Sequence, residues 1–256
     1  MEKLRGLNGA TLKWIAIIIM AIDHAGAALM EPILLSPSGQ YVEVVGITLS
    51  LAEFYNVYMF IRAIGRTAFP IFAYLIVEGY CHTKSKGKYI RNMLLAGLIS
   101  EIPFDLAIFR QMFDLEHQNV MFTLAIGVMM LWAIESVMTR LGDRFSEYLW
   151  LPQTVQLLIA AAFMAFAELV MHTDYGYVGV LCIYVIYYTR PRKVLGVSLA
   201  VLLLTLMNGL EIYAIPAILF VKLYNGTRGK QNKYFFYLFY PVHLLLLFFI
   251  AYSFIY

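Results

Sequence analysis

Long apolar runs separated by short polar stretches dominate the chain, and their lengths match membrane-spanning helices. A spanning helix needs roughly 20 mostly apolar residues, with about 17–25 common. The pattern predicts nine such segments, near 12–34, 59–81, 89–109, 119–139, 152–172, 174–190, 194–209, 210–224 and 234–256. The three segments between 174 and 224 are short, which indicates tilt, kinks or a locally thinned bilayer.

Polar residues interrupt the pattern between the first two runs. Ser36-Pro-Ser-Gly39 ends the first run, and residues 48–60 are predicted to form a short interfacial helix before the second span. The chain shows no internal repeat, low-complexity linker or soluble domain. We therefore expect an all-α polytopic membrane protein, with residues 1–256 forming a single bundle of about nine helices.

Composition strengthens this expectation. Hydrophobic residues make up 62% of the chain and charged residues 14%, with a mean hydropathy of +0.74. Soluble domains are about 45–50% apolar and about 25% charged, so the surplus apolar surface must face lipid. The net charge of +3 is small and decides little, and no nucleic-acid partner is expected.

Neither a disulfide framework nor a cleaved signal peptide is expected. Cys81 and Cys182 fall in or beside hydrophobic runs, at no metal-ligand spacing, so no metal site is expected. Residues 1–13 are basic, but the apolar run after them contains Asp23 and His24, and no small-residue cleavage site follows.

The distribution of lysine and arginine predicts that the N-terminus is cytoplasmic. In short loops these residues stay on the cytoplasmic side. Nine spans that start inside place 16 of the 19 lysines and arginines there. Arg110 falls outside, and Arg62 and Arg66 lie in or beside the second span. The opposite orientation reverses this bias, so we expect a multi-pass protein of the cell membrane with its N-terminus inside.

The first span carries ionisable residues at membrane depth. His24 follows Lys13 by eleven residues, which is three helical turns plus about 20°, so both side chains share one face and lie roughly 16 Å apart along the axis. Asp23 points about 100° away and needs a partner from another helix. A charge at a helix centre costs about 2.5–3.5 kcal/mol, so such residues are typical of functional sites. The alternative for His24 is a hydrogen-bonded structural histidine.

The last span carries a second histidine at a similar depth. His243 lies nine residues, about 14 Å, from the inner end of its span near Tyr234. Pro241 removes a backbone donor two residues before it. His24 and His243 are therefore predicted to flank one site near the bilayer midplane. The alternative for His243 is a hydrogen bond to a backbone carbonyl.

Two further pairs of charged residues have helical spacing. Arg62 and Arg66 are one turn apart, as are Glu101 and Asp105. We expect ion pairs between these two helices, and the alternative is a polar wall that binds an acceptor substrate. Asp174 precedes an apolar run and is predicted to cap the N-terminus of a helix.

A cationic stretch lies between the second and third spans. Residues 84–91 hold four lysines and arginines, and the positive-inside bias alone accounts for them. Lys88 and Arg91 are nevertheless three residues apart at a predicted helix start, where a phosphate binds favourably.

These segments together resemble the TraX family, named for the enzyme that acetylates conjugative pilin. The resemblance runs from one end of the chain to the other. It rests on Leu12–Gly26, Ile64–Tyr80, Ile99–Asp105, Gln118–Thr123, Asp174–Val180 and Lys233–His243. TraX proteins in turn resemble a larger superfamily of transmembrane acyltransferases, which use cytosolic acyl-CoA to modify sugars and other groups outside the cell.

That resemblance implies an acetyl-CoA-dependent O- or N-acetyltransferase occupying residues 1–256 as one domain. The superfamily's first helix carries a basic residue, ten residues and then histidine, as do Lys13 and His24 here. Lys88-Tyr-Ile-Arg91 resembles its paired-basic motif, with lysine in place of the first arginine, and the alignment rests on position alone. Tyr240 and His243 resemble a tyrosine and histidine of a late helix.

The resemblance also implies a role for each group of residues. Acetyl-CoA would be the acyl donor, bound through its phosphates by Lys13, Lys88 and Arg91. His24, with His243 and Asp23, would carry the chemistry. His24 would act as general base or as a transient acetyl carrier, and direct transfer is favoured because one base suffices. Arg62, Arg66, Glu101 and Asp105 would contact the acceptor.

The acceptor stays open between a pilin-like N-terminus, a peptide, a glycan and a lipid headgroup. A different class of protein is also possible on these residues. Midplane carboxylates and arginines line the paths of small transporters and channels, although the repeats typical of many transporters are not found in this sequence.

Overall fold

The computed structural model describes residues 6–37, 39–44, 46–141 and 150–254, and this part of the chain is almost entirely helical. The α-helices are α1 (Gly9–Ala25), α2 (Glu31–Leu35), α3 (Leu51–Gly65), α4 (Ala68–His82), α5 (Lys86–Phe104), α6 (Val120–Leu141), α7 (Trp150–Leu169), α8 (Gly176–Tyr188), α9 (Lys193–Met207), α10 (Pro216–Leu223) and α11 (Lys233–Phe254). The other helices are the π-helices η2 (Gly26–Met30) and η3 (Asp105–Phe109) and the 3₁₀-helices η4 (Arg190–Arg192) and η5 (Gly209–Ala214). An antiparallel hairpin of β1 (Tyr41–Val44) and β2 (Ile47–Ser50) precedes α3.

Within the described residues, six helical segments are long and apolar enough to cross a membrane, so the protein is a multi-pass membrane protein. They are Gly9–Leu35, Leu51–His82, Lys86–Phe109, Val120–Leu141, Leu151–Leu169 and Tyr234–Ser253. The remaining segments predicted at 174–190, 194–209 and 210–224 form α8, α9 and the pair η5 and α10. With 13, 15 and 8 residues, α8, α9 and α10 are shorter than an ordinary span, so the expected total of nine crossings is not confirmed.

The second predicted span is longer than expected. Residues 48–60 do not form a separate interfacial helix, because most of them belong to α3, which continues through residues 66 and 67 into α4. A capping box at Ser50 fixes the start of this long helix. Its hydroxyl accepts a hydrogen bond from the backbone of Glu53 (3.3 Å), and the Glu53 carboxylate accepts one from the Ser50 backbone (2.9 Å). The helix therefore begins at Leu51.

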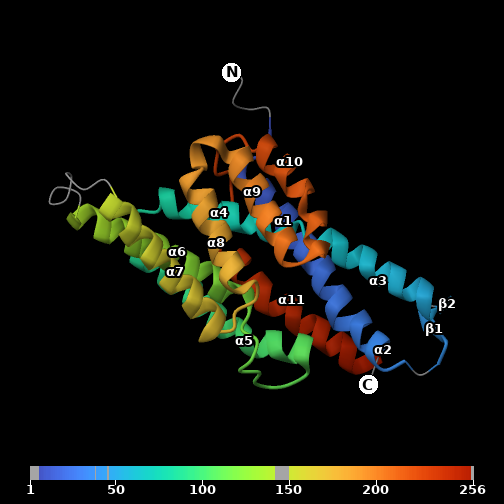
Figure 1. The fold of residues 1–256 in the computed structure, drawn as a ribbon. Coiled ribbons are helices and arrows are strands. Elements are labelled where there is room, and N and C mark those ends of the chain that lie inside the picture. The colour runs from blue at the N-terminus through green and yellow to red at the C-terminus, as the bar shows by residue number, and fades with distance from the viewer. Residues whose placement is uncertain (1–5, 38, 45, 142–149, 255–256) are drawn as a thin grey trace.

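The cation-bearing segments meet at one end of the bundle. Leu7 pairs with Tyr224 as a short parallel bridge, and the Lys193 ammonium donates to the Tyr224 carbonyl. Arg190 pairs with Glu78 near the end of α4 (3.8 Å). The described N-terminal segment lies at this end and α11 finishes at the opposite end (Figure 1). This clustering agrees with the predicted grouping of cations, and which side of the membrane they face stays a prediction.

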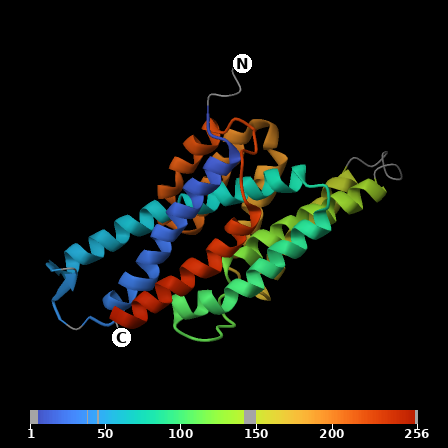
Figure 2. The same ribbon diagram turned by 180° about the vertical axis from the view of Figure 1, so that it is seen from behind.

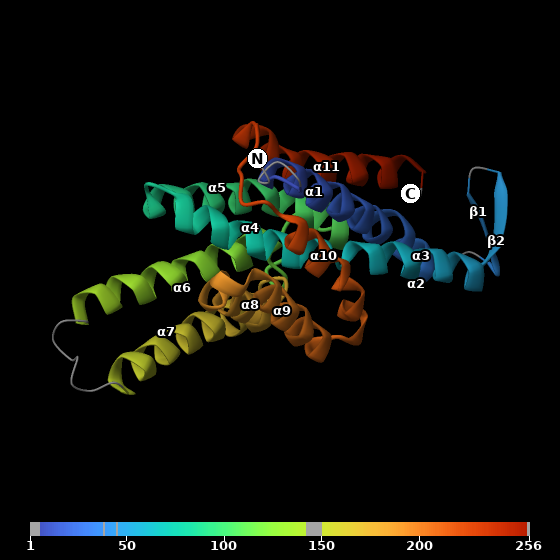
Figure 3. The same cartoon turned by 90° about the horizontal axis from the view of Figure 1, so that it is seen from above.

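Two groups of helices lie on opposite sides of α4. Seen from behind, α11 runs beside α1 and α5 (Figure 2). Seen from above, α6, α7, α8 and α9 lie on the other side of α4 (Figure 3). The main buried core joins α4, α6, α8 and α9, and a smaller one joins α1, the end of α5 and α11. A cavity lies where these groups meet.

Candidate functional site

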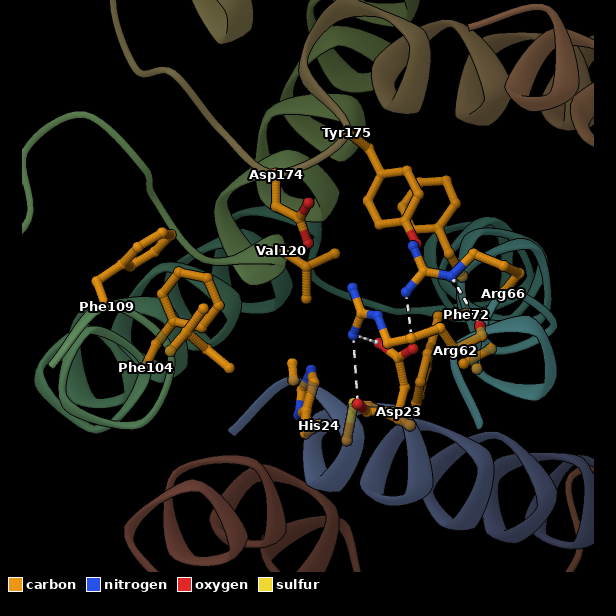
Figure 4. A pocket seen from close by; sticks show the side chains of 16 residues that line it. Asp23, His24, Arg62, Arg66, Phe72, Phe104, Phe109, Val120, Asp174 and Tyr175 are labelled. Carbon is orange, nitrogen blue, oxygen red and sulfur yellow. Dashed lines mark hydrogen bonds and ion pairs between the residues drawn. The ribbon is translucent and has the colours of Figure 1, made fainter. Parts of the chain in front are cut away.

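A cavity of about 180 Å³ lies between α1, α3, α4, the end of α5, the start of α6 and the loop before α8. Most of its wall is apolar and aromatic, and includes Met20, Phe69, Phe72, Phe104 and Phe109. Its polar groups belong to Asp23, His24, Arg62, Arg66, Asp174 and Tyr175 (Figure 4). An apolar pocket with a few convergent polar groups is the usual form of a small-molecule site.

The two predicted histidines meet at this cavity. His24 lies in the last turn of α1, and its Nδ1 is 2.7 Å from Nε2 of His243 on α11. Nδ1 of His243 is 2.8 Å from the carbonyl oxygen of Phe239. The structure therefore brings His24 and His243 to one site, and it also contains the carbonyl contact considered as the alternative for His243.

The hydrogen-bond pattern assigns the tautomers of both rings. Because the Phe239 carbonyl can only accept, Nδ1 of His243 carries a hydrogen. A neutral His243 then has a lone pair on Nε2, so it accepts a hydrogen bond from Nδ1–H of His24. The remaining nitrogen of His24, Nε2, keeps its lone pair. His24 is thus held as a base.

Four charged side chains form an ion-pair network beside His24. Asp23 accepts from Arg62 at 2.9 Å and from Arg66 at 2.7 Å, and Arg66 also pairs with Glu211 at 3.1 Å. The side chains of Arg66 and Glu211 are only 12% and 2% exposed, so each needs its partner. The prediction that Asp23 is satisfied by another helix is confirmed.

The predicted ion pairs between Arg62 or Arg66 and Glu101 or Asp105 are wrong. The reason is the packing, since α3 lies against α1 and η5, whereas α5 lies against α6 and α11. Glu101 instead accepts from the Asn119 side chain, and Asp105 accepts from the backbone of Asp114 (2.9 Å). Of the four residues predicted to contact an acceptor, Arg62 and Arg66 line the cavity, and neither Glu101 nor Asp105 is part of its wall.

Asp174 reaches the cavity although the sequence predicted another role for it. Tyr175, not Asp174, precedes the first residue of α8, and the carboxylate that accepts from the first turn of this helix is Glu168, which bonds the Tyr177 N–H (3.2 Å). The Asp174 side chain instead opens into the cavity (Figure 4). It lies in the loop outside the candidate spans, and it is exposed because its side chain borders the open cavity. Gly176 signals a turn here, but the direction of the carboxylate depends on a backbone conformation that the pattern does not reveal.

The three predicted phosphate-binding cations occupy two places. Lys13 is half-buried on α1, and its ammonium lies 5.5 Å from the ring centre of Phe236 on α11. Since His24 also contacts α11, the two side chains share one face of α1, as predicted. Lys88 and Arg91 are exposed on the first turns of α5, which begins after its cap at Ser85. No described contact joins them to Lys13.

The family model for the TraX protein matches residues 8–251. The chain belongs to the TraX family. This TraX-family chain is also 28% identical over 262 residues to the probable fimbrial assembly protein FimC, serogroup H1, of Dichelobacter nodosus. That alignment covers 92% of each chain, so the two proteins are similar over nearly their whole length. No solved structure matched the TraX-family chain.

Proposed function

We propose that this TraX-family protein is a cell-membrane acetyltransferase that moves an acetyl group from cytosolic acetyl-CoA to an acceptor outside the cytoplasm. The observation that carries the proposal is the free lone pair of His24 Nε2, at a small and largely apolar cavity inside the bundle. A base in this position needs a substrate with an acidic N–H or O–H, which the amine or hydroxyl of an acceptor supplies.

The transfer is direct. As the acceptor nitrogen or oxygen attacks the thioester carbonyl carbon, its proton passes to His24 Nε2. The new N–C or O–C bond forms, the C–S bond breaks, and the imidazolium returns the proton to the CoA thiolate. His243 accepts the hydrogen bond from His24 Nδ1–H throughout, which stabilises the charged ring. A transient acetyl group on His24 Nε2 is the alternative route.

The donor approaches from the cationic end. Lys13 lies on the same face of α1 as His24 and roughly 16 Å nearer that end, a distance that the pantetheine arm of acetyl-CoA is suited to bridge. Lys13, Lys88 and Arg91 bind the phosphates in this proposal, by the resemblance to transmembrane acyltransferases. The arm then delivers the thioester to the cavity along α1.

The acceptor approaches from the other end. TraX is associated with the acetylation of pilin, and the Dichelobacter relative is named as a fimbrial assembly protein. Both associations favour a subunit of a surface fibre as the acceptor. A peptide, a glycan or a lipid headgroup also carries an amine or a hydroxyl that could accept the acetyl group. The cavity of about 180 Å³ admits an acetyl group and the end of an acceptor chain.

Purified protein tests the proposal. Incubated with acetyl-CoA and cell-envelope extract, the wild-type protein is expected to release CoA thiol at a steady rate that depends on the extract. His24→Ala is expected to lose 10²- to 10⁴-fold of this rate, the usual contribution of a positioned base. His82→Ala is the matched control, because His82 is exposed and bonds only the Glu78 carbonyl in the described contacts. Solute uptake by reconstituted protein without thiol release would instead indicate a transporter.

A further inference from the structure

The Asp174 carboxylate has no charged partner among the described residues. The carboxylate accepts a hydrogen bond from the backbone N–H of Tyr175. Arg62 and Arg66 act on it through the electrostatic field, yet neither lies within ion-pair distance. The residue is exposed and lines the cavity, so its carboxylate is open to any ligand that enters there. Asp174 therefore lacks a partner that a ligand can supply.

The backbone around Asp174 is strained. His172 and Tyr175 have φ values of 46° and 63°, in the left-handed region that bulky residues rarely adopt, and Gly176 has a φ of 42°. Such a conformation is unfavourable for a non-glycine residue and persists only where its surroundings enforce it.

Contacts on both sides hold this strained loop in place. The Asp174 backbone N–H donates to the Gln118 carbonyl (2.8 Å), and the Thr123 hydroxyl donates to the Asp174 carbonyl. The ring of Tyr175 stacks on Phe69, with centroids 3.9 Å apart. The consequence of all these contacts is that the Asp174 side chain opens into the cavity that contains His24 (Figure 4).

The ion-pair network beside the cavity is neutral without Asp174. Two guanidinium groups, of Arg62 and Arg66, face the carboxylates of Asp23 and Glu211, and all four are paired with one another. Asp174 is the third carboxylate, and its negative charge is in excess. The cavity is thus suited to a cationic group.

We propose that Asp174 binds the acceptor, holding its protonated primary amine beside His24. This inference rests on the proposed function. The bound ammonium passes one proton through the Asp174 carboxylate to solvent and becomes a neutral amine. The amine nitrogen then attacks the thioester carbon, the N–C bond forms and the C–S bond breaks. Its second proton passes to His24 Nε2 and from there to the CoA thiolate, which leaves as the thiol.

A pair of probes that differ in one atom tests this role. Glycyl peptide carries a terminal amine, and the glycolyl peptide of otherwise equal sequence carries a hydroxyl instead. Asp174→Asn should weaken binding of the glycyl peptide to the full-length protein by roughly 10- to 150-fold, the range for loss of one charge-assisted hydrogen bond. Binding of the glycolyl peptide and of acetyl-CoA should change little. Asp174→Glu keeps the charge and should restore part of the affinity.

Controls separate this inference from the proposed function. Glu116→Gln removes an exposed carboxylate from the loop before α6 and should leave both affinities unchanged. Glycyl-peptide affinity is measured without acetyl-CoA, on protein that melts at its normal temperature. Equal affinity in the wild type and in Asp174→Asn would overturn the role of Asp174. If both proteins still transfer acetyl groups, the proposed function is unaffected by that result. Selective binding of the glycyl peptide through Asp174, with no thiol release from acetyl-CoA, would support this site and overturn the proposed function.

Discussion

At the scale of single residues, His24 and His243 have different tasks although their rings are nearly parallel and 5.0 Å apart. His24 lines the cavity, and in the proposed reaction the lone pair on its Nε2 takes the proton of the acceptor. Both ring nitrogens of His243 form hydrogen bonds within the protein, one with the Phe239 carbonyl and the other with His24. His243 is therefore a positioning residue, which selects the tautomer of His24 and stabilises its charged form.

Substitution of His243 tests this division. His243→Ala should lower kcat by roughly 10- to 150-fold, because the hydrogen bond to the His24 imidazolium is lost, while acetyl-CoA affinity is kept. His243→Gln should recover part of the rate, since its side-chain carbonyl can accept from His24 Nδ1–H. Equal losses in both variants would show that His243 supports only the packing of α11.

The positions of single side chains were predicted correctly where the geometry of one helix is enough to determine them. The depths of His24 and His243 follow from the rise per residue, so their meeting was predictable. The need of Asp23 for a partner was predictable for the same reason. The identity of that partner was not, because it depends on which helices pack together. Asp174 was missed because its direction depends on the left-handed backbone of Tyr175.

At the scale of elements, the ion-pair network depends on a close approach of α1 and α3. Arg62 lies on α3 and Arg66 follows one turn later, directly after its last residue, and both pair with Asp23 of α1. Gly65 lies at this crossing, and a Cβ at that position would overlap the Asp23 carboxylate. Glycine here permits the two backbones to lie close enough for both ion pairs.

Gly65→Ala should therefore displace Asp23 and destabilise the protein. Overpacking of this kind costs about 1–3 kcal/mol, so the melting temperature in detergent should fall by several degrees and thiol release should fall with it. Gly87→Ala is the matched control in α5, because its Cβ would meet only the Trp132 ring at 4.0 Å. An alanine there should be neutral or slightly stabilising. Equal melting temperatures of the two variants would contradict this account of the crossing.

Element boundaries were predictable only in part. The long apolar runs became helices near the expected positions, because length and hydropathy suffice for them. The predicted segments 194–209 and 210–224 divide near the expected boundary, at Asn208, whose extended backbone ends α9 and whose side chain caps η5. Hydropathy does not show that only the short helices η5 and α10 follow this break, so the number of crossings could not be read from the sequence.

At the scale of the whole molecule, the site lies inside a bundle whose two ends differ. Cation-bearing segments gather at the end that holds the start of α1, and the β1–β2 hairpin lies toward the other end (Figure 1). The cavity lies between these ends, with His24 in its wall. This arrangement suits a protein that accepts its donor on one side of the membrane and its acceptor on the other.

The most direct test of this account encloses the acceptor and keeps the donor outside. Vesicles containing the purified protein would hold glycyl and glycolyl peptides inside and receive isotope-labelled acetyl-CoA outside, so that only molecules with their cationic end outward can react. Wild-type protein should acetylate an enclosed peptide and release one CoA thiol outside for each acetyl group transferred, and His24→Ala should do neither. Labelled peptide that forms only when peptide and acetyl-CoA share the same side, or equal labelling by His24→Ala, would contradict transfer across the membrane through this site.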